Sequence, residues 1–309
     1  MPSGIGIRLA CIAARPASAI MNSARFTVTQ AKYDAYRALT YRLARGAQLR
    51  SADEAVRYVD ERGFVYFWPI KGVDFPSLWV AVAGRRPVAD RHDDPGHVTW
   101  GWKDRLLPER RWYYGKLLRG KATMVSLATL PYFYALSENY GDPNDYLLEY
   151  EAGRLSAEAR QVYEALLTHG ALDTLALRRE ARLTSRDSNT RFERALVELQ
   201  RSLRILPIGV AEAGRWNYAF IYELVDRWLP QVVQQARAIG RGEAWVRLLD
   251  LYLQSVGAGT EAQMAQLFHW RKDDVTKACA ALARAGRALP LERLAGQAGS
   301  WWAAPKLAK

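Results

Sequence analysis

Cysteine is scarce in this chain, and its scarcity argues against two classes of protein. Only Cys11 and Cys279 occur among the 309 residues, far apart and outside any CxxC pair. A disulfide scaffold needs several cysteines, and a cysteine-based zinc site needs closely spaced pairs of them. We therefore expect neither, and a reducing, cytoplasmic compartment suits the sequence best.

Long apolar runs and nucleotide-binding motifs are also absent. No run approaches the roughly 20 apolar residues of a membrane span. The sequence contains no Walker loop, GxGxxG fingerprint, GxSxG elbow or HExxH helix. Nucleotide-driven, redox, serine-hydrolase and zinc-protease functions therefore lose their usual markers. We expect no membrane partner and no cofactor.

Acidic residues are missing from residues 1–24, whose only charged side chains are Arg8 and Arg15. Arg8 interrupts the apolar stretch of this segment, and Met21 offers an alternative translation start. We expect residues 1–27 to be a disordered tail or the product of a misassigned start. A weak targeting leader is the alternative.

Positive charge, by contrast, is abundant. The chain has 44 Lys and Arg against 32 Asp and Glu, a formal net charge of +12. Such a balance attracts polyanions over a long range and favours DNA, RNA or an anionic membrane surface as the partner. Half of the residues are hydrophobic, so a chain of this length can bury a large core and form two or three domains.

Residues 155–224 predict a winged-helix module, which consists of three helices followed by a β-hairpin. Ser156 is typical of a helix N-cap, and Gly170 is typical of the end of that first helix. The second helix follows from Thr174 after a short turn. The third helix and the hairpin complete the module.

Thr184 is expected to cap the third helix, with Asp187 three residues later. The apolar residues that recur at helical spacing along this helix are Phe192, Leu196, Leu199 and Leu203. A turn at Ala213-Gly214 then joins two runs that read as strands.

The commonest use of a winged helix is to bind duplex DNA through its third helix. Thr190, Arg194 and Arg201 lie opposite the apolar face of that helix. The residues expected to contact DNA, on this helix and near the tip of the hairpin, are Ser185, Arg186, Asn189, Thr190, Arg191, Arg194 and Arg215. The alternative is a winged helix that contacts only other proteins.

Two further segments repeat this pattern of elements. From Gly242 the sequence predicts three helices, one of them capped by Thr260, and then two strands. Near the N-terminus, a helix begins at Thr29 and another has Ser51 and Glu54 as a capping box. Gly63 ends that second helix, and a strand follows.

These elements predict an α+β chain, mainly α with short β-hairpins. We expect tandem winged helix-turn-helix domains at 28–150, 151–236 and 237–309, the first carrying an aromatic and basic insertion. Helical bundles with accidental spacing are the alternative.

The order of several short motifs resembles that of a known family. These motifs are Arg37-Ala38-Leu39, Gly63-Phe64-Val65, Leu78-Trp79 and His97-Val98-Thr99-Trp100. Together with the tandem winged helices, they look like the AlkZ-like (YcaQ-like) winged-helix DNA glycosylase superfamily, most strongly from Tyr41 to Pro230. The resemblance implies a concave, basic DNA-binding surface and metal-free excision of alkylated or crosslinked bases.

The sequence departs from this family at its catalytic signature. The family has Gln-X-Gln or Gln-X-Asp on the strand after the second helix, where this chain has Tyr66, Phe67 and Trp68. Cleavage of an N-glycosidic bond passes through an oxocarbenium-like centre and needs a group that positions water. Tyr66 is a poor proton acceptor, since an unperturbed tyrosine titrates at about 10. Trp68 can only stack on a nucleobase. The chain resembles a divergent branch, either catalytically different or inactive.

Lys71 and Asp74 lie just after that strand, in a loop bounded by proline and glycine. Asp74 is a candidate for orienting water. Lys71 is a candidate for contacting phosphate or for attacking an abasic sugar as an amine nucleophile. The alternative is an ordinary surface ion pair.

The segment from His92 to His97 contains the only cluster that suggests a metal. Two histidines and two carboxylates are acceptable zinc ligands, but the Pro-Gly turn among them gives no established geometry. The alternative is a turn in which Asp93 or Asp94 caps the backbone. The resembled family needs no metal, and we expect none.

Basic and aromatic side chains alternate along residues 100–121. Cationic side chains can neutralise phosphates while rings stack against an exposed base. The cations expected to contact DNA are Arg110, Arg111, Lys116, Arg119 and Lys121. About half of the rings are expected in the core, and Trp112 and Tyr113 form an apolar stripe.

Three functions remain open. The first is a monomeric DNA-binding glycosylase that flips damaged bases toward the strand of Tyr66 and Trp68. The second is a winged-helix protein that recognises damaged or regulatory DNA without catalysis. The third is a protein-interaction scaffold whose positive charge is incidental. Salt-dependent binding to duplex DNA separates the first two from the third.

Overall fold

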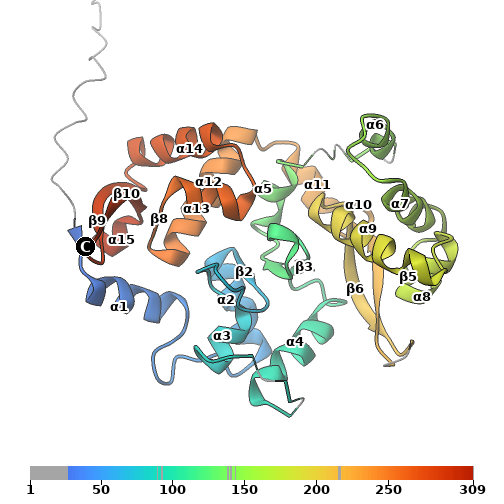
Figure 1. Cartoon of the computed structure of the whole chain (residues 1–309), viewed down its shortest axis with the longest axis horizontal. Helices are drawn as coiled ribbons and strands as arrows, with labels where there is room; N and C mark the ends of the chain where they lie inside the picture. The colour runs from blue at the N-terminus through green and yellow to red at the C-terminus, as the bar shows by residue number, and fades with distance from the viewer. Residues whose placement is uncertain are drawn as a thin grey trace, which may run out of the picture.

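The computed structural model describes residues 27–308 apart from 89, 92, 138, 140, 143, 215 and 216. The predicted tail, His92 and Arg215 therefore lie outside the described residues, except for Thr27. The chain is α+β, with many helices and three small sheets (Figure 1). In the part of the chain described, no helix is long and apolar enough to cross a membrane.

The N-terminal part forms a small antiparallel sheet covered by helices. Its elements are α1 Gln30–Thr40, α2 Ala52–Arg62, β2 Phe64–Tyr66, α3 Leu78–Ala83, η2 Pro95–His97, α4 Val98–Leu106, β3 Tyr113–Gly115, η3 Leu118–Gly120, β4 Thr123–Val125 and α5 Leu130–Tyr134. The strand order is β2-β4-β3. The strand expected to run to Trp68 ends at Tyr66.

Local signals at this end of the chain behave largely as expected. The side chains of Thr29 and Ser51 cap α1 and α2, and Gly63 ends α2 with a positive φ. The reciprocal bond of the expected capping box differs, because the Glu54 carboxylate accepts from Arg50 N at 2.7 Å instead of from Ser51 N.

The central part has four α-helices, a short 3₁₀ turn and a three-stranded sheet. Its elements are α6 Asp145–Glu151, α7 Ala157–His169, β5 Leu172–Asp173, α8 Thr174–Glu180, η4 Arg186–Ser188, α9 Asn189–Arg201, β6 Ile205–Ala211 and β7 Ala219–Leu224. The strand order is β5-β7-β6, and every pairing is antiparallel. Ser156 caps α7 and Gly170 ends it, as predicted.

The predicted cap of the third helix is wrong, because α9 has Ser188 at its N-cap, four residues after Thr184. Ser185, with extended backbone, instead caps a short 3₁₀ turn before α9 and accepts from Ser188 N at 3.2 Å. Leu183 is buried just before this turn. The Ser188 hydroxyl also donates to the carbonyl of Leu183 at 2.7 Å, which fixes where the chain turns.

The C-terminal part packs helices against the third sheet. Its elements are α10 Val225–Trp228, α11 Pro230–Ala236, α12 Arg241–Val256, β8 Ala258–Gly259, α13 Glu261–Phe268, α14 Lys272–Arg284, β9 Leu289–Leu294, β10 Gln297–Ala303 and α15 Pro305–Ala308. Thr260 caps α13 in a full capping box with Gln263. The two strands predicted here form an antiparallel pair.

The first described strand joins the C-terminal strands in this third sheet. Its strand order is β1-β9-β10-β8, where β1 is Thr27–Val28 and runs parallel to β9 (Figure 1). The largest buried cluster likewise joins distant segments, since it contains Phe64, Leu206 and Leu248 together. Contacts of this kind fix the spacing between the helices that surround the site described next.

Candidate nucleic-acid interface

Helix α9 has one buried face and one basic face. Phe192, Leu196 and Leu199 recur at helical spacing and are buried in one cluster with residues of α7. Arg194 and Arg201 are exposed on the helix. The apolar face therefore fixes the helix to the protein and leaves the cations in solvent.

An open depression of about 660 Å³ follows this basic face. Lys116 lines it from the segment after β3, and α9 supplies the rest of the lining together with Ser202. The lining residues are Lys116, Thr190, Glu193, Arg194, Val197, Glu198, Arg201 and Ser202.

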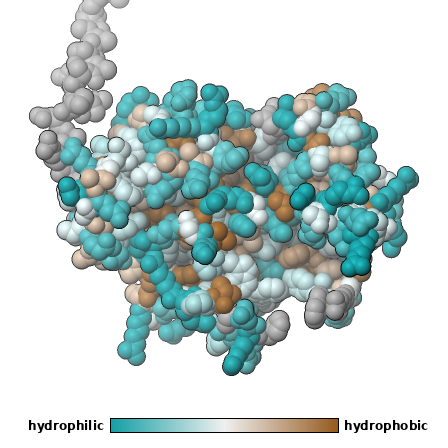
Figure 2. Space-filling model, viewed as in Figure 1, coloured by the Kyte–Doolittle hydropathy of each residue, from teal (hydrophilic) through white to brown (hydrophobic). Residues whose placement is uncertain are grey.

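A deeper cleft of about 720 Å³ adjoins the depression, because both are lined by Glu198, Arg201 and Ser202. The cleft lies among η3, α5, the C-terminal end of α9 and the turn between α13 and α14. Arg119 lines it as well. Neither Arg119 nor Arg201 forms an ion pair with any residue that the structure describes. Figure 2 shows apolar atoms in the middle of the viewed face, with hydrophilic side chains around them.

A small hollow of about 60 Å³ adjoins the cleft at Arg119. Asp74, Tyr252 and Gln266 are among its other lining residues. We call the depression, the cleft and the hollow together the basic groove. Its cations without an ion-pair partner among the described residues are the exposed Arg119, Arg194 and Arg201 and the half-buried Lys116. Arg154 and Arg204 also line the cleft and pair with Glu149 and Asp145.

Backbone contacts hold the walls of the groove together. Gln200, in the last turn of α9, accepts from Lys116 N through its side chain at 3.0 Å and from the Tyr113 hydroxyl through its carbonyl at 3.2 Å. Gly120 has a φ of +66°, and a Cβ there would lie 3.3 Å from the Val197 side chain. The close approach of η3 to α9 therefore places Arg119 and Arg201 on neighbouring walls.

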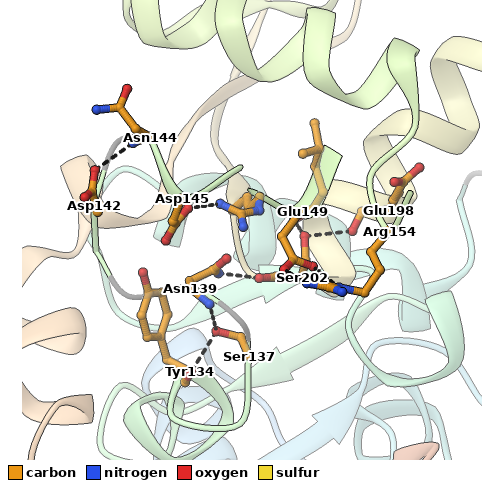
Figure 3. Close-up of polar contacts among 12 residues, drawn as sticks. Tyr134, Ser137, Asn139, Asp142, Asn144, Asp145, Glu149, Arg154, Glu198 and Ser202 are labelled. Atoms are coloured by element: carbon orange, nitrogen blue, oxygen red, sulfur yellow. Dashed lines mark hydrogen bonds and ion pairs between the residues drawn. The ribbon is translucent and has the colours of Figure 1, made fainter. Parts of the chain in front are cut away.

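The carboxylates that line the cleft accept hydrogen bonds from other groups of the protein (Figure 3). Glu149 accepts two bonds from the Arg154 guanidinium, at 2.6 and 2.9 Å, and these bonds lower the pKa of Glu149. Glu198 accepts from the backbone N and the hydroxyl of Ser156, each at 2.7 Å. The acids thus brace the start of α7 and the segment after α6.

Six of the polar residues singled out in the sequence line the basic groove. They are Asp74, Lys116, Arg119, Thr190, Arg194 and Arg201. Ser185, Arg186, Asn189 and Lys121 are exposed but do not line the groove, and Arg215 lies outside the described residues.

Three other predicted cations have protein partners. The Arg110 guanidinium lies 4.0 Å from the centre of the Trp228 ring. Arg111 is 3.9 Å from Asp53, and Arg191 is 3.0 Å from Glu158. Their positive charges therefore already interact with groups of the protein itself.

The structure does not bring Tyr66 and Trp68 together. Tyr66 is fully buried beside Phe75, and its hydroxyl has no hydrogen-bond partner among the described residues. Burial raises the pKa of Tyr66 to about 12. Trp68 lies in another cluster and packs against Trp79 and Trp100.

Asp74 and Lys71 do not pair with each other within the described structure. The Asp74 carboxylate pairs with Arg37 and lies 3.8 Å from Arg85. Lys71 is exposed on the preceding turn and does not line the hollow. Asp74 is therefore in an ion pair, but its partner Arg37 is buried, so the pair differs from the surface ion pair considered as an alternative.

The turn before α4 is the capped turn considered as an alternative to a metal site. Asp94 accepts from Gly96 N at 2.7 Å and pairs with Arg86 at 2.6 Å. The bonds from Arg86 lower the pKa of Asp94 to about 2. Among the described residues, which exclude His92, no three His, Cys, Asp or Glu side chains are grouped as they would be around a metal ion.

A buried lysine that no sequence pattern indicates joins the hairpin to α4. Lys103 is 2% exposed. It donates to the Tyr218 hydroxyl at 2.8 Å and lies 2.7 Å from Asp104. Its Nζ is also 4.5 Å from the centre of the Phe220 ring. Aromatic residues alternate before and along β7, but this pattern does not indicate that a lysine packs against them.

The chain is similar to known proteins both in sequence and in fold. Residues 49–269 match the model of a family described as AlkZ related. Among solved structures, the DNA glycosylase AlkZ of Streptomyces sahachiroi has a similar fold. The TM-score is 0.53 and the sequence identity 16%, over 91% of this chain and 72% of that chain. No curated protein matches the chain. The family model spans more than half of the sequence, and the chain belongs to the AlkZ-related family.

Proposed function

We propose that this protein binds damaged duplex DNA along the basic groove and hydrolyses the N-glycosidic bonds of alkylated or crosslinked bases. The observation that carries the proposal is the set of four cations in adjoining hollows, of which Arg119 and Arg201 have no ion-pair partner among the described residues. Unpaired cations in a concave surface focus attraction for phosphates. Membership of the AlkZ-related family supports DNA as the partner.

In this proposal α9 acts as the recognition helix of a winged helix. Helices α7, α8 and α9 precede the β6–β7 hairpin, with β5 between α7 and α8. Helices α12 to α14 followed by β9 and β10 form a second such unit. A division at 28–150, 151–236 and 237–309, action as a monomer and a cytoplasmic location belong to the same proposal.

The proposed chemistry uses water held beside Asp74. The hollow lined by Asp74 and Arg119 has about 60 Å³, and a water molecule needs about 10–15 Å³ of such space. Asp74 would orient that water and stabilise the positive charge that develops on the sugar. Lys71 would contact a neighbouring phosphate. The scheme requires no cofactor or metal.

A non-catalytic DNA-binding protein is the second candidate. It is favoured by the aromatic residues at the family's catalytic positions, since Tyr66 is fully buried. It is also favoured by the pairing of Asp74 with Arg37. Both candidates share the basic groove and differ only in whether base release occurs.

Incubation with alkylated duplex DNA separates the two candidates. The assay counts abasic sites, with an active member of the family as the positive control and heat-denatured protein as the blank. We expect release by the native protein and its loss in Asp74→Asn, with unchanged binding to the duplex. Glu61→Gln, an exposed carboxylate that does not line the groove, is the matched control. Equal turnover in Asp74→Asn would remove Asp74 as the water-orienting group, and no release where the positive control succeeds would favour the second candidate.

A further inference from the structure

The cleft combines a stacking surface, a buried hydrogen-bonding group and unpaired cations. We propose that it holds a single nucleobase rotated out of the duplex, with its flanking phosphates on Arg119 and Arg201. The inference rests on the proposed binding of DNA. It places the extruded base in a cleft that neither Tyr66 nor Trp68 lines.

Trp270 provides the stacking surface. Its ring stacks on Phe268 with centroids 4.2 Å apart and planes 15° apart, and both residues line the cleft. Trp245 braces Trp270 from a second direction, at 6.5 Å. Every base has a flat face that can stack on such a ring. The cleft volume of about 720 Å³ lies within the usual range of small-molecule sites.

Asn139 provides the buried polar group. Its side-chain amide donates to the carbonyl of Ser202, and its backbone N donates to the Ser137 hydroxyl (Figure 3). The residue is only 8% exposed, and its Oδ1 accepts no hydrogen bond from the described residues. Buried acceptors are normally satisfied. Because Oδ1 has almost no accessible surface, the Asn139 amide has to turn toward the cleft before the N–H groups of a base edge can supply the missing donor.

Arg119 and Arg201 make the cleft positively charged. Arg119 comes from η3 and Arg201 from the last turn of α9, so they stand on different walls. Glu149 is neutralised by Arg154. The unpaired charges of Arg119 and Arg201 therefore remain to attract the phosphates of the DNA backbone. Arg119 also lines the hollow of Asp74, so the cleft for the base and the proposed water adjoin.

The test compares two duplexes with the same protein. One carries the fluorescent adenine analogue aminopurine opposite an abasic analogue, so that the base costs little to extrude; the other is fully paired. We expect the wild type to bind the first more tightly and to change its fluorescence. Trp270→Ala should weaken that binding about ten-fold, leave the fully paired duplex unaffected and abolish the fluorescence change. Trp270→Phe, which keeps a ring, should retain the preference, and a melting curve checks that both variants are folded.

Trp100→Ala is the matched control, because Trp100 is 44% exposed on α4 and does not line the cleft. A preference that survives in Trp270→Ala, or that is lost in Trp100→Ala instead, would overturn the proposal. Equal binding of both duplexes by the wild type would overturn it too and leave the proposed function intact. Failure of the wild type to bind either duplex would overturn both.

Discussion

Replacement of Arg194 and Arg201 together by alanine should make DNA binding less sensitive to salt. Both side chains are exposed, and both line the depression along α9. Each cation that neutralises a phosphate adds about 0.9 to the slope of log affinity against log salt, so the double variant should lose about 1.8. Alanine is the best helix former, so α9 should persist.

The assay is fluorescence anisotropy of a labelled duplex, titrated at several salt concentrations from about 50 to about 200 mM. The control, Arg57→Ala with Arg284→Ala, removes the same charge from exposed positions on α2 and α14 that do not line the groove. The control should lower affinity slightly and keep the slope. A wild-type slope in the groove variant, or an equal loss in the control, would show that the net charge and not the groove binds the DNA.

Arg191 offers a comparison on the same helix. It lies 3.0 Å from the Glu158 carboxylate, so its charge is partly engaged before DNA arrives. Arg191→Ala should therefore change the slope by less than the 0.9 or so of a free cation. A loss as large as that of Arg194→Ala would mean that the ion pair with Glu158 opens on binding.

Three further predictions concern the scaffold of the groove. Asp145→Asn leaves the 5% exposed Arg204 without its buried counter-charge and should reduce the free energy of unfolding by about 3–5 kcal/mol in urea titration; Glu61→Gln, in the exposed pair with Arg42, should cost about 0–1 kcal/mol. Gly120→Ala, at a φ of +66°, should cost about 1 kcal/mol or more and weaken DNA binding by shifting Arg119. Burial lowers the pKa of Lys103, so the unfolded chain binds this proton more tightly. Stability should therefore rise with pH from the folded-state pKa up to about 10.4, and that rise should disappear in Lys103→Met when unfolding is measured at several alkaline pH values.

Local signals predicted the helix ends because they depend on neighbouring residues. The side chains of Thr29, Ser156 and Thr260 cap helices as expected, since each bonds to a backbone N–H within one turn. Gly170 ends α7 because its φ of +79° suits glycine. The error at Thr184 arises because a 3₁₀ turn capped by Ser185 comes first and delays the start of α9 to Asn189.

Long-range contacts were beyond the reach of such signals. The parallel pairing of Thr27 with Arg293 joins the first described strand to the C-terminal hairpin, and no local pattern specifies it. The basic groove is similar, because its walls come from η3, α9, the loop of Asp74 and the turn before Trp270. Helical periodicity identified Arg194 and Arg201, which belong to one helix. It could not identify Asn139 or Trp270, which reach the cleft from other elements.

The burial of Tyr66 bears on how this branch of the family departs from its catalytic signature. Tyr66 is fully buried among Phe64, Phe75 and other apolar residues. A glutamine at this position would bury an amide, and the tyrosine hydroxyl already lacks a partner among the described residues. The difference therefore extends from one side chain to its whole surroundings, which now exclude water. In the proposed function the water therefore lies on the exposed side of the groove, beside Asp74, and not beside Tyr66.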